Sequence, residues 1–557
     1  MEELARKYAL ANAYEFRGKA NMKAVVGKIL AERPKLKDDM KAVMATVERT
    51  ISEVNRLTPE EQKKELESIF PEYFRKEKRE TKKELPPLPG VSGEVVTRLP
   101  PEPNGFLHIG HGLSFFFNYY YARRYGGRLI LRFEDTNPEK ERLEYYEKIK
   151  EDIRWLKLDW DEERCVSGDL PALYEYAERL IESEQAYVCE CPQEKIKEYR
   201  FGKKTCGCRE RSNEENKRMW REMFASSKPI LRLKGDMKSV DVEMRDPTLF
   251  RVVQTPHPIQ KEKYRVWPTY DFECSVEDAI LGITHVLRSN EFHTHLQNHI
   301  RNLLGLRHPT IIQYSRFNVR DSPAAKRKIK PLIEKGIVPG WDDVRLTTLR
   351  GLKRRGIVPE TIHTLAHEMG LSTSEPEIDW SIIEAINRKI IDPSTRRLFF
   401  VPEPVRLIVD GAPEIRVTLN FHPHNDLGVR EIETHGIFFV PRSDFVGKEG
   451  HVVRLKDLYN IKIEEVGEDI HAVFHSRELA KTEKLQWVTE DCIPISVDVA
   501  GSLFINDEYN PQSLVTREGF AERACETLVE GDIVQFERVG FARLDDARTL
   551  RFVLAHR

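Results

Sequence analysis

The order of apolar segments between residues 94 and 156 limits the fold of this chain more than any other feature of its sequence. Residues 94–99 form a short apolar run typical of a buried strand, and residues 113–124 form an aromatic-rich helical segment. Residues 128–133 are again strand-like, and an amphipathic helical pattern follows them. A strand, a helix and a second strand in this order predict a parallel, doubly wound sheet.

The turn between the first strand and the first helix carries His108, Gly110 and His111. An open parallel sheet binds its ligands at the carboxyl ends of its strands, and a helix amino-terminus offers unpaired N–H groups to an anion. Two imidazoles three residues apart lie on one face of a helix, and Gly110 leaves room for a flat ring or a phosphate. This pattern suits stabilisation of charge on a phosphate during displacement. The alternative is a buried strand–turn–helix with two incidental histidines.

Length and composition point to a multidomain protein. A chain of 557 residues with 40% hydrophobic residues is expected to form several folded domains. No apolar run approaches the length of a membrane span, and the start Met1-Glu2-Glu3-Leu4 lacks a signal pattern, so we expect a cytoplasmic protein without a membrane partner. The net charge of −2 indicates that any nucleic-acid surface must be local.

Changes in composition predict the domain boundaries. Residues 1–85 carry apolar residues at helical spacing among many lysines and glutamates, and the Pro-rich stretch 85–90 is expected to be a stiff linker. Short β-rich runs separated by turn residues begin near residue 395 and predict barrels. The expected parts are a helical appendage at 1–85, an α/β domain at 91–330 with an insertion at 181–260, a helical region at 331–394, and β-barrels at 395–557.

Two C-x-C pairs lie in the insertion, Cys189 with Cys191 and Cys206 with Cys208. Four thiolates can close a tetrahedral zinc site, which suits a small insertion with a weak core. The sequence therefore predicts a structural Zn²⁺. Reduced, unliganded thiols are the alternative, and a catalytic zinc is not expected because four cysteines leave no open position.

The stretch RLPPEPNGFLHIGH, residues 98–111, resembles the glutamyl and glutaminyl branch of the class I aminoacyl-tRNA synthetases, whose signature is the HIGH tetrapeptide. The later segments RFEDTNP, RDP, YDF and GITHVLR are similar to the same branch. The β-rich tail resembles the paired-barrel anticodon-binding region of glutaminyl and archaeal- or eukaryotic-type glutamyl enzymes. The resemblance implies a Rossmann-type catalytic domain, with acceptor-end binding in the insertion and tRNA-stem contacts in the helical region.

Roles for individual residues follow from the resemblance. The residues that it implies for catalysis are His108, His111 and Lys326. Those that it implies for ATP binding are Pro101, Gly105, His108, Gly110, His111, Lys326, Arg327 and Lys328. Those that it implies for glutamate binding are Arg98, Asp135, Tyr270 and Arg288. Mg²⁺ is expected to accompany ATP.

Two of these positions have structural alternatives. Asp135 follows a strand and is implied to contact the α-ammonium group, but either it or Thr136 could instead cap the next helix from Asn137. Arg288 occupies the position that is Arg in glutamyl enzymes and a small neutral residue in glutaminyl enzymes. A guanidinium pairs with a side-chain carboxylate in fork geometry, whereas a neutral amide would leave its charge unpaired. The alternative is an ion pair between Arg288 and Glu291.

The second class I signature is a lysine loop, and here it departs from the family pattern. The matching stretch at 322–329 keeps Lys326 but has Ala325 in place of the expected serine. The lost hydroxyl removes one phosphate contact, worth about 1 kcal/mol. A solvated basic run is the alternative, as it is for the many basic residues between 301 and 355.

The resemblance implies a ligase that joins glutamate to the α-phosphate of ATP and passes the glutamyl group to the terminal ribose of tRNA-Glu. Whether tRNA-Gln is also a substrate stays open. Three alternatives remain. A glutaminyl-tRNA synthetase is opposed by Arg288, and a tRNA-binding paralogue without catalysis is motivated by Ala325. A nucleotidyltransferase without tRNA does not account for the β-rich tail.

Overall fold

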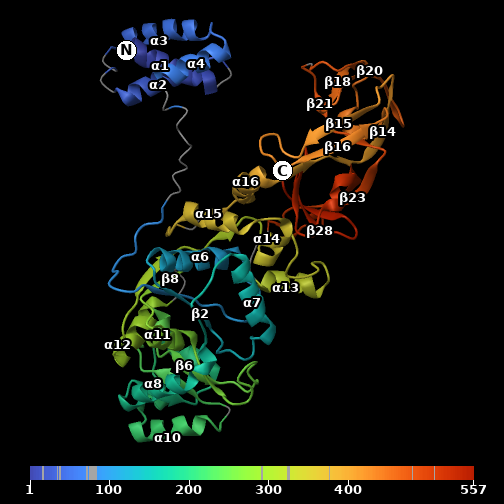
Figure 1. Ribbon diagram of the computed structural model, residues 1–557. Coiled ribbons are helices and arrows are strands. Elements are labelled where there is room, and N and C mark those ends of the chain that lie inside the picture. The colour runs from blue at the N-terminus through green and yellow to red at the C-terminus, as the bar shows by residue number, and fades with distance from the viewer. Residues whose placement is uncertain are drawn as a thin grey trace. The chain divides into compact units, whose positions relative to one another are not determined.

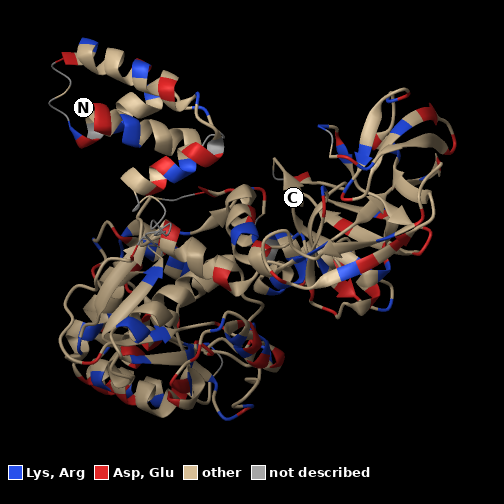
Figure 2. Ribbon diagram, turned by 45° about the horizontal axis from the view of Figure 1, so that its top comes forward, with Lys and Arg blue, Asp and Glu red and all other residues tan. Residues whose placement is uncertain are grey.

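The computed structural model describes residues 1–15, 18–33, 36, 39–70, 73, 84–226, 228–289, 293–322, 326–374, 377–479, 481–506 and 508–557. The chain divides into two compact units, Met1–Glu84 and Leu85–Arg557. Among the described residues, no helix is both long and apolar enough to cross a bilayer. Basic and acidic residues are interspersed over both units, as expected from the near-zero net charge (Figure 2).

The first unit is helical, as predicted for the appendage. Its helices are α1 (Glu2–Glu15), α2 (Met22–Glu32), α3 (Met40–Val54) and α4 (Pro59–Ile69). Apolar stripes of these helices meet in one core that includes Ala9, Val25 and Val47. Helix α4 begins with a capping box: the Thr58 side chain accepts the Glu61 N–H, and the Glu61 carboxylate accepts the Thr58 N–H.

A parallel sheet forms the centre of the second unit, as the strand–helix–strand order predicts. Its strands are β1 (Val96–Leu99), β2 (Arg128–Phe133) and β3 (Glu162–Cys165), in the order β1-β2-β3. The connecting helices are α6 (Ile109–Arg124) and α7 (Leu143–Trp155). A second parallel pair, β8 (His285–Ser289) and β9 (Thr310–Tyr314), lies beside β1, where the Thr284 N–H donates to the Val96 carbonyl at 3.0 Å.

Residues 85–90, predicted to be a stiff linker at the first domain boundary, begin the second unit and are packed against its core. Leu85 and Leu88 are buried in the core cluster of the parallel sheet. The Tyr121 hydroxyl of α6 donates to the Pro86 carbonyl at 2.7 Å, and the Leu88 N–H donates to the Tyr125 hydroxyl at 3.0 Å. Two leucines in a proline-rich segment bury enough apolar surface to hold it against a helix.

The insertion breaks the parallel pattern, as predicted, with an antiparallel sheet. Its strands, in the order β4-β5-β6-β7, are β4 (Ala186–Cys189), β5 (Ile230–Leu233), β6 (Thr248–Val252) and β7 (Val266–Pro268). Its helices are α8 (Leu170–Glu182), α9 (Gln193–Gly202) and α10 (Asn213–Met223). The chain then returns to the catalytic core through α11 (Tyr270–Ile280) and α12 (Thr294–Leu304), with the insertion at the end away from α6 (Figure 1).

A helical region connects the catalytic core to the β-rich tail. It contains β10 (Asn318–Val319), α13 (Lys326–Glu334), α14 (Leu349–Arg355), α15 (Pro359–Met369), β11 (Glu377–Ile378) and α16 (Trp380–Ile391). Several arginines of the predicted basic run form internal ion pairs there. Arg345 pairs with Asp343 at 2.8 Å and Arg354 pairs with Asp545 at 2.8 Å. A solvated face, the alternative for this run, does not describe these two arginines, because their charge joins parts of the fold.

The tail from Arg396 onward consists of strands, as predicted. One seven-stranded sheet is ordered β12 (Arg396–Leu398), β27 (Ile533–Phe536), β28 (Gly540–Asp546), β29 (Arg551–His556), β23 (Cys492–Ala500), β26 (Leu514–Glu522) and β13 (Phe400–Pro402). The other is ordered β21 (Lys484–Leu485), β18 (Val452–Leu455), β19 (Asn460–Val466), β20 (Ile470–Ser476), β14 (Pro404–Asp410), β17 (Ile437–Pro441) and β22 (Val488–Thr489). Two hairpins complete the tail, β15 (Ile415–Asn420) with β16 (Val429–Thr434), and β24 (Phe504–Ile505) with β25 (Glu508–Tyr509).

Candidate active site

His108 and His111 lie together at the amino-terminus of α6. His108 is the N-cap residue, and its Nδ1 accepts the Gly110 N–H at 3.1 Å. Its own backbone N–H donates to Nδ1 of His111 at 3.2 Å, and the two ring centroids are 3.9 Å apart. Because each Nδ1 is an acceptor, each neutral ring carries its proton on Nε2. Two imidazole N–H donors therefore accompany the positive end of the α6 dipole.

A segment from the helical region holds this turn in place. The Ile109 N–H donates to the Thr347 carbonyl at 2.9 Å, and the Leu349 N–H donates to the Leu107 carbonyl at 2.9 Å. A side chain at Gly110 would place its Cβ 2.9 Å from Cε1 of His108, so only glycine fits beside the ring. Sequence reasoning missed residues 347–349, because backbone pairing leaves no signal in side-chain type.

Pro101 and Gly105 lie in the loop that leads from β1 into the histidine turn, and both are buried. The Pro101 carbonyl accepts the Glu134 N–H at 3.0 Å, which joins the carboxyl ends of β1 and β2. The loop therefore lies along the edge of the sheet where ligands of parallel sheets bind.

The lysine loop is described only in part. Residues 323–325, including Ala325, lie outside the described residues, and so do the side chains of Lys326 and Arg327. Lys326 is the first residue of α13, and Lys328 is half-buried in its first turn. The roles of these three basic residues stay predictions.

Arg98 of β1 lies in a buried ionic cluster centred on Asp278 of α11. Its Nε donates to Oδ1 of Asp278 at 2.7 Å, and Nη2 contacts the Cys274 sulfur at 3.4 Å. Its Nη1 is buried and has no hydrogen-bond partner among the described residues. Asp278 also pairs with Arg132 at 2.9 Å and Arg301 at 3.0 Å. Although burial opposes ionisation, these guanidinium groups hold the pKa of Asp278 well below its usual range.

Arg288 of β8 is buried, and α12 holds its guanidinium group. Nη1 donates to Oε1 of Gln297 at 2.7 Å, and Nη2 donates to Oγ1 of Thr294 at 2.9 Å. Tyr270, the first residue of α11, interacts electrostatically with both Arg98 and Arg288, and burial raises its pKa well above the usual value. The structure thus brings together three predicted glutamate-binding residues. The alternative partner of Arg288, Glu291, lies outside the described residues.

The fourth predicted glutamate-binding residue, Asp135, is fully buried and bound by protein donors. Its Oδ1 accepts the Ser167 N–H at 2.8 Å, and its Oδ2 accepts the hydroxyls of Ser167 at 2.8 Å and Tyr146 at 2.9 Å. Burial raises the pKa of Asp135 to about 7. It does not cap a helix at Asn137, whose N–H donates to Glu141 instead.

The preceding residue, Glu134, differs from Asp135 in that one of its carboxylate oxygens accepts no hydrogen bond from the described residues. It is 5% exposed, and its Oε1 pairs with Arg132 at 2.8 Å. Its Oε2 is buried without a hydrogen-bond partner among the described residues, and the carboxylate interacts electrostatically with Tyr270. Sequence reasoning missed Glu134. The available signal was strand alternation, which directs neighbouring side chains to opposite faces.

The four cysteines of the insertion converge as the zinc prediction requires. Their sulfur atoms lie within 4.8 Å of one another, and the Cys189–Cys206 and Cys191–Cys208 pairs are each 3.9 Å apart. Zn–S bonds of about 2.3 Å in a tetrahedron place the sulfurs about 3.8 Å apart. Nη1 of Arg232 lies 4.0 Å from the Cys189 sulfur and 3.9 Å from the Cys206 sulfur, so a cation accompanies the buried pair. The residues fit a tetrathiolate metal site.

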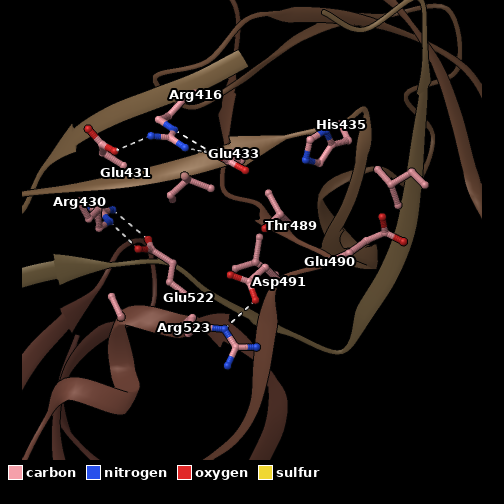
Figure 3. Close-up of a pocket in the computed structure, with 14 residues that line it drawn as sticks. Arg416, Arg430, Glu431, Glu433, His435, Thr489, Glu490, Asp491, Glu522 and Arg523 are labelled. Carbon is pink, nitrogen blue, oxygen red and sulfur yellow. Dashed lines mark hydrogen bonds and ion pairs between the residues drawn. The ribbon is translucent and has the colours of Figure 1, made fainter. Parts of the chain in front are cut away.

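The two β-rich sheets carry polar groups suited to a polar ligand. Arg397 of β12 and Gln535 of β27 are partners in register. Arg397 Nε and Gln535 Oε1 are both buried, and neither has a hydrogen-bond partner among the described residues. A separate pocket of about 460 Å³ lies where β16, β17, β22 and β26 meet (Figure 3). Its charges are largely paired, as in the contact of Arg523 with Asp491 at 2.6 Å.

Comparison with protein families defines the class. Residues 94–393 match the catalytic domain of the class I tRNA synthetases for E and Q, and residues 395–476 and 484–545 each match an anticodon-binding domain of these enzymes. The catalytic match covers the parallel sheet, the insertion and the helical region, and the anticodon-binding matches cover the β-rich sheets. The chain belongs to the class I tRNA synthetases of the glutamyl and glutaminyl family.

Three archaeal glutamate–tRNA ligases are similar to this chain over nearly its whole length. The glutamate–tRNA ligase of Thermococcus kodakarensis is 40% identical over 99% of this chain and 98% of its own length. That of Korarchaeum cryptofilum is 41% identical over 100% of this chain and 99% of its own length. That of Methanocaldococcus jannaschii is 38% identical over 100% of both chains. These matches extend over the amino-terminal helical unit as well as the family domains.

Proposed function

We propose that this chain is a glutamate–tRNA ligase, which activates glutamate with ATP and transfers it to the terminal ribose of tRNA-Glu. The observation that carries the proposal is that Arg98 and Arg288 are both buried and both interact electrostatically with Tyr270. Glutamate has two carboxylates, and two buried guanidinium groups match them, whereas glutamine would leave one cation unpaired. The names of the archaeal relatives support the same substrate.

In this proposal the substrate is held at both ends. Arg288 pairs with the side-chain carboxylate in the position that α12 fixes, and Arg98 offers its Nη1 to the other carboxylate. Glu134, rather than Asp135, receives the α-ammonium group. The assignment to Glu134 is supported by its unpartnered oxygen, whereas both oxygens of Asp135 already accept hydrogen bonds.

The histidine turn binds ATP and stabilises the reacting phosphate. His108 and His111 donate from Nε2 to phosphate oxygens as charge builds on the α-phosphate. Pro101, Gly105 and Gly110 shape the approach of the nucleotide along the sheet edge, and Lys326, Arg327 and Lys328 supply positive charge. Mg²⁺ bound with ATP would neutralise part of the phosphate charge. No covalent protein nucleophile is needed.

The β-rich sheets bind the anticodon, and the insertion binds the acceptor end. The adjacent donor of Arg397 and acceptor of Gln535 suit the edge of a base. In the insertion, Cys189, Cys191, Cys206 and Cys208 hold a structural Zn²⁺ that stabilises the fold around β4. tRNA-Gln remains open as a second substrate.

Aminoacylation tests this function. Purified tRNA-Glu and tRNA-Gln are each incubated with the chain, ATP–Mg²⁺ and labelled glutamate or labelled glutamine. Charging of glutamate on tRNA-Glu supports the proposal, and charging of tRNA-Gln as well defines a non-discriminating ligase. Glutamine charging would instead identify a glutaminyl-tRNA synthetase, and tRNA binding without charging would identify a paralogue without catalysis.

A further inference from the structure

Two buried carboxyl groups, Glu134 and Glu273, interact with each other beside Tyr270, at the proposed amino-acid site. Glu134 follows β2, and Glu273 lies in the first turn of α11. Glu134 is 5% exposed and Glu273 is 1% exposed. The Oε2 atom of each is enclosed by protein and has no hydrogen-bond partner among the described residues. Glu273 interacts with Glu134 and with the side chain of Thr136.

The basic groups that face Glu273 are engaged by other partners. From β2, Arg132 faces Glu273 but is committed to Glu134 and Asp278. From β6, Arg251 faces Glu273 but donates to the Pro268 carbonyl at 2.7 Å and the Thr136 carbonyl at 3.1 Å.

On α11 itself, Glu277 lies one turn beyond Glu273, and it interacts with Arg132 and Glu134. Burial, followed by the neighbouring Glu134 carboxylate, raises the pKa of Glu273 well above its usual value. Two carboxylates that share an enclosed site do not both ionise unless a cation joins them.

We propose that Glu134 and Glu273 share one proton before the amino acid binds, and that the α-ammonium group of the bound amino acid takes the place of that proton. The shared proton leaves to solvent, both groups become carboxylates, and the ammonium keeps its three protons and donates to both. The inference rests on the proposed function and adds Glu273 to the substrate-binding residues. The α-ammonium group of the substrate is itself the cation that joins the two carboxylates.

This exchange makes glutamate binding depend on pH. Below the pKa of the pair, binding must remove a proton, so the KM for glutamate falls as pH rises and becomes constant once the pair is ionised. The α-amino group of free glutamate stays protonated through this range. The kcat has no such dependence on the pair, because the proton is lost at binding rather than during chemistry.

The test is the KM for glutamate in aminoacylation between about pH 6 and about pH 8.5, for the unaltered chain, Glu273→Gln and Glu277→Gln. Glutamine has the shape of a protonated glutamate and cannot release a proton. We expect Glu273→Gln to remove the pH dependence of KM and to raise KM about tenfold at the upper pH, with little change in kcat. Glu277→Gln is the matched control, since it neutralises another buried acid of α11, and should keep the pH dependence.

A KM that is independent of pH in the unaltered chain would overturn the inference, as would an unchanged pH dependence in Glu273→Gln or its loss in Glu277→Gln. If Glu273→Gln does not fold, calorimetry of the unaltered chain decides. Glutamate binding in the presence of tRNA, measured in two buffers of different ionisation enthalpy, should release up to one proton, and release of none would contradict the exchange. Failure to charge glutamate at any pH would count against the proposed function instead.

Discussion

The Nε atom of Arg98 in β1 lies 2.7 Å from Oδ1 of Asp278 in α11, although 180 residues separate them in sequence. The same carboxylate binds Arg132 and Arg301, so one acid on α11 orients three guanidinium groups. Both partners of the first pair are enclosed by protein. Asp278 therefore fixes Arg98 so that Nη1 remains available to a ligand.

Substitution of Asp278 by Asn should destabilise the chain. Loss of the charge leaves Arg98, Arg132 and Arg301 buried without a counter-charge, which costs about 3–5 kcal/mol. We expect a lower midpoint in denaturant unfolding and a higher KM for glutamate. Glu377→Gln, which breaks an exposed pair with Arg320, is the control and should leave the midpoint nearly unchanged. Equal shifts in both variants would contradict the role of burial.

The two roles of His108 can be separated by His108→Asn. Asparagine is a good N-cap residue, so helix α6 and the thermal midpoint should be retained. It cannot place a donor where Nε2 lies, so kcat should fall about 100-fold to 1,000-fold with little change in the KM for glutamate. Aminoacylation kinetics and a melting curve together check this. A lower thermal midpoint of unfolding, with an unchanged kcat per folded molecule, would mean that His108 only caps the helix.

Arg288→Cys should weaken the use of glutamate far more than the binding of ATP. The substitution removes the cation that we propose pairs with the side-chain carboxylate, and it leaves the histidine turn in place. We expect the KM for glutamate to rise at least 100-fold, as for loss of a charged hydrogen-bonding partner. The KM for ATP is measured in the same assay, and equal increases in both values would show that Arg288 does not contact the substrate.

Metal analysis tests the cysteine cluster. After dialysis the chain should retain about one zinc atom, and Cys206→Ser should lose most of it, because a hydroxyl is a poor zinc ligand at neutral pH. Cys525→Ser is the control, since Cys525 is also buried but lies in the β-rich tail. Absence of bound zinc, together with reaction of the half-buried Cys191 and Cys208 with a thiol reagent under native conditions, would support free thiols.

His556 should make the stability of the chain fall as the solution becomes acidic. It is buried in β29, its Nε2 contacts Nδ2 of Asn387 at 3.0 Å, and burial lowers its pKa to about 4. An unfolded histidine titrates near pH 6.5, so the unfolded chain binds more protons below that pH. The stabilising contribution is complete above about pH 6.5 and is lost as pH falls toward about 4.

His556→Gln should therefore reduce the change in thermal midpoint between about pH 7 and about pH 5. His435→Gln is the control, since His435 is exposed and its loss removes no buried neutral ring. A pH dependence that is the same in His556→Gln and in the unaltered chain would show that other groups govern acid sensitivity.

Several predictions from periodicity and spacing were confirmed. The alternating apolar segments predicted the parallel sheet, and the helical spacing of apolar residues in 1–85 predicted the helices of the first unit. The spacing of the cysteine pairs predicted a cluster of four sulfurs. Each of these signals is local, because it depends on residues within a few turns or strands of one another.

The packing of the stiff linker predicted at residues 85–90 could not be predicted from sequence, because proline content says nothing about what the leucines contact. Leu85 and Leu88 bury themselves against α6, and only the assembled core offers that surface. The proposed glutamate site shows the same limit. Ser167 and Tyr146, which follow in the chain, donate hydrogen bonds to Asp135, and the sequence does not show that they engage Asp135 rather than its neighbour Glu134.

The sequence by itself determined the class of fold, the position of the histidine turn at a strand end, the thiolate cluster and the β-rich tail. Tertiary structure alone decided which groups meet: Arg98 with Asp278, residues 107–109 with 347–349, and Glu134 with Glu273. The reason is physical. Periodicity records which face of an element is buried, whereas the partner of a buried charge depends on how distant elements pack.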